Sequence, residues 1–173
     1  ENVGAYRSQM INSLNGKVLR LDPATGDGVP GNPFYDPENP RAPRSRVWNL
    51  GLRNPYRIAI LPGSGSHNRE DANPGILFIG DVGWNTWEDM HVSTGPGLNF
   101  GWPAFEGMTA HPDYYNANIL NRDAPNPFYG VNGCNQQYLY FNQLIKQDSL
   151  NPISFTDSCG NPIPASIPTF RHT

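Results

Sequence analysis

Charged residues are scarce in this sequence, and the scarcity narrows the function classes open to it. Asp, Glu, Lys and Arg make up 16% of the 173 residues, whereas soluble domains average roughly 25%. The 12 basic and 15 acidic residues give a formal net charge of −3. A small basic cluster, Arg41, Arg44 and Arg46, lies in a proline-rich connector, where a solvated loop is expected. Without a clustered basic face, a nucleic-acid partner is not expected.

Long apolar runs and uninterrupted helical windows are also missing. No stretch of 18 apolar residues occurs, so no membrane-spanning helix is predicted. The 18 glycines and 18 prolines interrupt nearly every window long enough for a helix, which argues against a helical bundle. Disordered chains are poor in aromatics, yet aromatics reach 12% here. These exclusions leave a folded, loop-rich, all-β chain.

Cysteine is limited to Cys134 and Cys159, both in polar, loop-like sequence. No other Cys or His stands at the short spacing of a metal site. A disulfide would close a loop of 25 residues and contribute roughly 3 kcal/mol in the chain-entropy model. It would also imply an oxidising compartment, whereas two free thiols in a cytosolic protein are the alternative. The start at Glu1 suits a mature secreted protein or an excised fragment.

Short alternating runs bounded by turn residues predict strands. They cover residues 17–21, 46–50, 56–61, 76–80, 87–93 and 167–170. The continuous apolar run 76–80 predicts a strand buried on both faces. The three strands between 56 and 93 suggest a meander, as in a sandwich or a propeller blade. Helices are predicted only over 5–14 and 141–149, and residues 104–166 are expected to form a long insertion rich in Asn, Pro and Tyr.

The tripeptide Arg53-Asn54-Pro55 lies between a strand end and a strand start. Pro55 holds Asn54 extended and fixes the direction in which Arg53 and Asn54 project. An Arg fork suits a carboxylate or phosphate, and Asn adds donor and acceptor groups. The alternative is that Arg53 ties loops together through backbone carbonyls.

A second candidate, Asp81-Val82-Gly83-Trp84-Asn85, follows the buried strand. A Gly in such a loop lets backbone carbonyls turn toward a cation, and calcium takes six to eight oxygens. Asp81, Glu88 and Asp89 add side-chain oxygens nearby. The alternative is an ordinary turn in which Asp81 and Asn85 cap their own backbone.

Four phrases occur in an order and spacing that resemble the glucose/sorbosone dehydrogenase family. They are Gly16–Asp22, Gly51–Pro55, Gly80–Gly83 with Trp87–Asp89, and Asn99–Pro103. The resemblance covers roughly residues 14–107. It implies part of a six-bladed β-propeller, about one to two blades, that oxidises sugars with pyrroloquinoline quinone (PQQ) and calcium. Residues 108–166 resemble an insertion of multidomain extracellular relatives, and 167–173 would begin the next propeller strand.

The resemblance also assigns roles. Arg53 and Asn54 would reach the quinone, and the backbone carbonyls of Gly83 and Trp84 would bind its calcium, although soluble glucose dehydrogenases carry Pro where this chain has Trp84. Asp81, Glu88 and Asp89 are less direct carry-overs with a structural alternative. The family's histidine base comes from an earlier blade, so neither His67 nor His91 is assigned to it, and no catalytic residue is expected in this chain.

The resemblance implies an extracellular or periplasmic parent enzyme whose partners are a sugar substrate and the remaining blades. This chain supplies too few strands to close a propeller, so a fragment is expected. One alternative is a non-catalytic propeller that binds carbohydrate or protein. The other is a structural part of a large surface protein.

Overall fold

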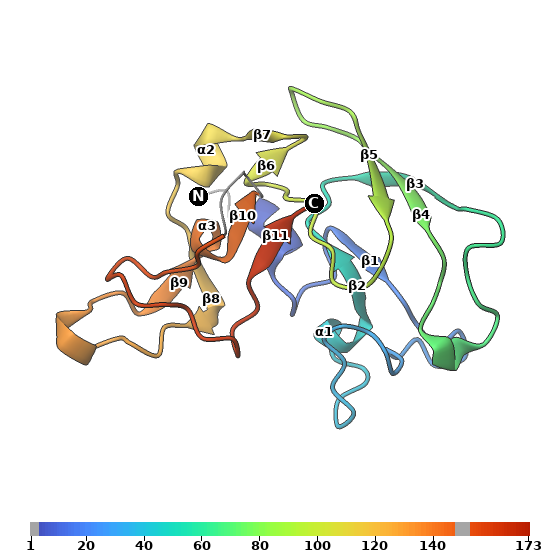
Figure 1. The fold of residues 1–173 in the computed structure, drawn as a ribbon, viewed down its shortest axis with the longest axis horizontal. Coiled ribbons are helices and arrows are strands. Elements are labelled where there is room, and N and C mark those ends of the chain that lie inside the picture. Colours follow the sequence, from blue (N-terminus) through green and yellow to red (C-terminus); the bar gives the residue numbers. More distant parts are fainter. Residues whose placement is uncertain (1–3, 148–152) are drawn as a thin grey trace.

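The computed structural model describes residues 4–147 and 153–173. Figure 1 shows several small sheets joined by long loops, with short helices between them. The strands are β1 (Lys17–Leu19), β2 (Val47–Leu50), β3 (Pro55–Ile60), β4 (Leu77–Asp81), β5 (Asp89–Ser93), β6 (Phe105–Glu106), β7 (Thr109–Ala110), β8 (Leu120–Pro125), β9 (Tyr138–Tyr140), β10 (Ile145–Gln147) and β11 (Phe170–His172). This architecture confirms the all-β prediction.

The helices of the described residues are single short turns. They are η1 (Ala5–Gln9), α1 (Pro43–Arg46), η2 (Arg69–Asp71), α2 (Pro112–Tyr115), η3 (Val131–Gly133) and α3 (Phe141–Leu144). Within the described ranges, no helix has the length and apolar character needed to cross a membrane.

The largest sheet is the antiparallel meander β3-β4-β5, which confirms the expected three strands. Its register places Ile79 between Ile58 and His91, and Asp81 opposite Asp89. Leu77, Ile79 and Asp81 face the core, whereas Phe78 and Gly80 are only partly buried. The prediction that 76–80 is buried on both faces was therefore wrong, because the core covers one face of β4 and leaves the other partly open.

Asn99 joins this half of the chain to the C-terminal strands. It bridges in parallel to Leu50 of β2 and to His172 of β11. Its buried side-chain amide exchanges hydrogen bonds of 2.7 and 3.0 Å with Gln9, and its Oδ1 accepts from Gly101 N–H at 3.0 Å. This amide therefore satisfies buried polar groups from three distant segments.

Two apolar clusters make most of the core. One lies under the meander and contains Val18, Trp48, Leu52, Leu77, Ile79 and Phe100. The other joins η1 to the segment after residue 107 through Tyr6, Trp102, Tyr114 and Phe141. Tyr6 stacks on Phe141 with ring centroids 4.7 Å apart. The segment 108–166 is thus packed against the N-terminal part of the chain.

Both predicted helices are shorter than expected. The 5–14 helix ends at Gln9, because Ser8 and Gln9 donate side-chain hydrogen bonds to the Trp102 carbonyl instead of extending the helix. The 141–149 helix ends at Leu144, since Ile145–Gln147 pair in parallel with β11, and its positions 148–149 lie outside the described residues. The strand predicted at 167–170 begins only at Phe170.

Candidate functional site

Arg53 and Asn54 lie between β2 and β3, at the end of the meander where β4 finishes. Asp81, the buried last residue of β4, accepts hydrogen bonds from the backbone N–H of Arg53 to Oδ2 at 3.0 Å and of Asn54 to Oδ1 at 2.6 Å. Val82 N–H donates to the Asn54 carbonyl at 3.1 Å. The Asp81 carboxylate therefore fixes the backbone from which both predicted cofactor-binding side chains project.

The Arg53 guanidinium is held on two sides. Nη1 donates to the Val82 carbonyl at 2.8 Å, and Cζ lies 5.4 Å from the centre of the Trp102 ring, within cation–π range. The loop-tying alternative is thus realised by one donor. A guanidinium carries five N–H donors, and the others find no hydrogen-bond partner among the described residues, so an anion could still bind to this fork.

The loop after β4 is shaped by Gly83. A Cβ at this position would lie 1.5 Å from the Trp87 carbonyl oxygen, so only glycine permits the close approach. Gly83 N–H donates to Glu88 Oε2 at 3.2 Å. The carbonyl oxygens of Gly83 and Trp84 accept no hydrogen bond from a described donor. An open hollow of about 240 Å³ runs along residues 83–88, and the two carbonyls suit a cation that prefers oxygen ligands.

Glu106, which the sequence analysis missed, holds this loop from the other side. Its buried carboxylate on β6 accepts from the N–H groups of Trp84 and Thr86, the latter at 3.1 Å, and from the Thr86 hydroxyl. Burial acts to raise the pKa of Glu106, but these hydrogen bonds outweigh it and lower the pKa. Its sequence signal was a single carboxylate at the end of the apolar run Ala104-Phe105.

Aromatic side chains from the predicted insertion form one wall of the site. His111 stacks on Trp84, with ring centroids 5.0 Å apart and planes inclined by 17°. Tyr114 and Trp102 contact the same indole, which stays 46% exposed. The segment after residue 107 therefore positions Trp84.

The predicted acidic residues gather around a cavity of about 10 Å³ between Arg53, Gly83, His91 and Glu106, which has room for about one water. Burial is the main cause that raises the pKa of Asp89, and nearby Asp81 and Glu106 add to it. Asp81 and Glu88 use their oxygens on backbone N–H groups. Both support the site's backbone, so the loop carbonyls have more capacity left for a cation.

The histidines are mostly packed. His91 Nε2 lies 3.5 Å from Asp81 Oδ2, and its ring stacks on Phe100 at 4.5 Å. His172 is buried against Phe105, while His67 is exposed.

The two cysteines form the expected disulfide, Cys134–Cys159, with Cα atoms 5.8 Å apart. It joins the end of η3 to the turn around Asp157. The alternative of two free thiols is not what the structure shows.

Comparison with known proteins places these features in a family context. The model of the family described as Glucose / Sorbosone dehydrogenase matches residues 1–130. Aldose sugar dehydrogenase YliI of Escherichia coli (strain K12) is 28% identical over 103 residues, which are 60% of this chain and 24% of that protein. A crystal structure from Thermus thermophilus, described as a putative oxidoreductase (glucose dehydrogenase), shares 35% identity, 64% of this chain, 29% of its own chain and a TM-score of 0.44. The chain thus spans about a quarter of the curated relative's length.

Proposed function

Because this chain belongs to the glucose/sorbosone dehydrogenase family, we propose that it forms part of the cofactor face of a PQQ-dependent aldose dehydrogenase. The observation that carries the proposal is the Asp81 carboxylate, which holds the backbone of Arg53 and Asn54 beside the Gly83–Trp84 loop. The printed activity of the E. coli relative supports an aldose as substrate. Further propeller blades would complete the pocket.

Arg53 and Asn54 would hold the cofactor. The remaining guanidinium donors of Arg53 suit the carboxylates of PQQ, and the exposed Asn54 amide offers both a donor and an acceptor. When bound, PQQ supplies a two-electron acceptor for the hydride removed from an aldose. The role of the chain is to orient this acceptor on a loop that Asp81 keeps rigid.

The Gly83 and Trp84 carbonyls would hold calcium beside the cofactor. Glu88, Asp89 and Glu106 surround this loop with negative charge, which favours a cation. His111 and Tyr114 restrict the Trp84 side chain, so the carbonyl of the same residue is held in place as well. Because Trp84 stands where soluble glucose dehydrogenases have proline, the stacked rings take over the stiffening that a proline ring provides.

The general base of the reaction would come from outside residues 1–173. His91 is held between Asp81 and Phe100, and His67 belongs to the opposite end of β4. An extracellular or periplasmic compartment is proposed, supported by the Cys134–Cys159 disulfide.

The test is a titration of the full-length protein with PQQ and calcium, combined with dye reduction by aldoses. Arg53→Ala should weaken PQQ binding by about 1.5–3 kcal/mol, the range for a charged hydrogen bond. Arg57→Ala, at an exposed arginine of β3, is the matched control and should bind normally. Neither binding nor dye reduction in the unmodified protein would overturn the proposal.

The second candidate function is a non-catalytic propeller that binds carbohydrate or another protein. It is favoured by exposed apolar side chains in the disulfide-linked segment, where Tyr129 is 55% and Val131 47% exposed. In that case Arg53→Ala leaves partner binding intact, and PQQ does not bind.

A further inference from the structure

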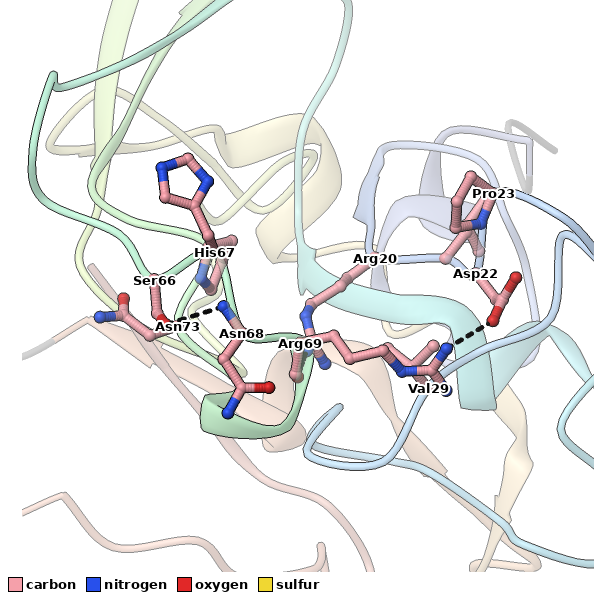
Figure 2. A pocket seen from close by; sticks show the side chains of 11 residues that line it. Arg20, Asp22, Pro23, Val29, Ser66, His67, Asn68, Arg69 and Asn73 are labelled. Atoms are coloured by element: carbon pink, nitrogen blue, oxygen red, sulfur yellow. Dashed lines mark hydrogen bonds and ion pairs between the residues drawn. The ribbon is translucent and has the colours of Figure 1, made fainter.

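A second hollow lies at the opposite end of β4 from Arg53 and Asn54. It has a volume of about 310 Å³ and lies between residues 20–23, which follow β1, and the loop that joins β3 to β4. Figure 2 shows Arg20, Asp22 and Arg69 side by side, with Ser66, His67, Asn68 and Asn73 around them. None of these residues belongs to the proposed cofactor face.

Arg20 is held firmly in this hollow. Nη1 donates to the Pro30 carbonyl at 3.0 Å and to Asn32 Oδ1 at 3.2 Å, and Nη2 donates to the Arg69 carbonyl at 2.5 Å. Its guanidinium also lies 5.6 Å from the ring centre of Trp48. These contacts keep the positive charge in one place, which lowers the conformational cost of binding a ligand there.

The charges of the hollow do not balance. Arg69 Nη1 lies 2.8 Å from Asp22 Oδ2, which leaves the charge of Arg20 without a partner carboxylate among the lining residues. Burial, followed by the nearby charge of Arg69, lowers the pKa of Arg20. The Arg69 side chain is 66% exposed, and its Nε and Nη2 donors find no hydrogen-bond partner among the described residues.

We propose that this hollow is a binding site for a small oxyanion: a carboxylate, phosphate or sulfate group on a molecule of up to monosaccharide size. Guanidinium groups bind such groups with short, charge-assisted hydrogen bonds. The volume matches the lower end of small-molecule sites, and Asn68 and Asn73 on its wall offer amide groups to hydroxyls. The site is separate from the proposed oxidation of aldoses and does not depend on it.

The first experiment is a calorimetric titration of the full-length protein with inorganic phosphate, sulfate, glucuronate and glucose, at low ionic strength. Saturable binding of the anions, but not of neutral glucose, is expected. Tighter binding of glucuronate would identify a carboxylated sugar as the ligand, and equal or tighter binding of phosphate or sulfate a free ion. Absence of saturable anion binding, or equal binding of glucose, would overturn the proposal.

Two variants then test the assigned groups in opposite directions. Arg69→Gln should weaken anion binding about tenfold, which is the loss of one charged hydrogen bond. Asp22→Asn should tighten binding several-fold, because it removes the competing carboxylate from Arg69 and keeps an oxygen for the N–H groups of Ala24 and Thr25. Arg57→Gln is the control and should leave binding unchanged. Unaltered affinity in both test variants, with unchanged thermal unfolding, would contradict the site.

Discussion

At the scale of single residues, buried carboxylates organise the candidate site. Asp81 ties the start of β3 to the end of β4, and Glu106 ties β6 to the loop after β4. Each accepts backbone N–H groups that would otherwise stay without partners in a poorly hydrated place, and ionised acceptors make the stronger hydrogen bonds. The two side chains therefore set the backbone geometry on which Arg53 and Trp84 depend.

We expect Asp81→Ala to lower the free energy of unfolding by about 1.5–3 kcal/mol, because it removes a charged acceptor from the N–H groups of Arg53 and Asn54. Asp81→Asn keeps one acceptor oxygen and should lose less. Urea unfolding of the full-length protein measures both. Asp113→Ala, at an exposed position of α2, is the control, and a loss no larger than that of the control would contradict the assigned role.

His172 makes stability depend on pH. Burial first, and then the charge of nearby His91, lowers the pKa of His172 from 6.5 to about 4. The stability gained by keeping this ring neutral is complete above pH 6.5 and is lost as the pH falls from there toward 4, because the unfolded chain binds the proton first. The loss is on the order of 3 kcal/mol.

The measurement is the free energy of unfolding between about pH 4 and 8, which spans the titration of His172 in both states. His172→Phe, which can keep the stacking on Phe105, should flatten the acid side of the profile, while His67→Phe at an exposed position should not. An unchanged slope in His172→Phe would show that other groups cause the acid sensitivity.

At the scale of elements, the strands of the meander followed from the sequence, whereas those after residue 104 did not. Alternating runs predicted β3, β4 and β5 to within about two residues. The strands β6 to β10 are two to six residues long, too short for a periodic pattern to be recognised. Partners distant in the chain select them, as β11 selects β10.

The disulfide is the main covalent constraint on the segment 108–166. Removing it with the double substitution Cys134→Ser and Cys159→Ser should cost roughly 3 kcal/mol, because the unfolded chain regains the freedom of a 25-residue loop. Urea unfolding with and without reductant measures the cost. The reduced wild-type protein should match the double variant, and equal stability of oxidised and reduced forms would contradict the prediction.

At the scale of the whole molecule, the meander exposes apolar side chains on both faces. Ile58 and Ile60 of β3 are 51% and 57% exposed, and Met90 and Val92 of β5 are 75% and 45% exposed. Contiguous exposed apolar surface of this kind marks an interaction site. It supports the proposal that further blades of a longer protein pack against the sheet.

Ile58 tests this proposal directly. If another blade covers it, Ile58→Ala should lower the stability of the full-length protein by about 2–4 kcal/mol, the cost typical of a buried isoleucine. A residue that stays on the surface would change it by less than about 0.5 kcal/mol. Glu70→Ala, at an exposed position of η2, is the control. Equal unfolding midpoints for the two variants would argue against a covering blade.

The sequence by itself determined the all-β class, the three-stranded meander, the family and the pairing of Cys134 with Cys159. These depend on composition, local alternation and ordered phrases, which need no knowledge of distant contacts. Only the tertiary structure decided that Asp81 and Glu106 serve as backbone acceptors, that His111 packs on Trp84, and that Arg20 meets Arg69. Each of these contacts joins residues at least 20 positions apart, and the pattern along the chain does not encode which distant groups the packed core brings together.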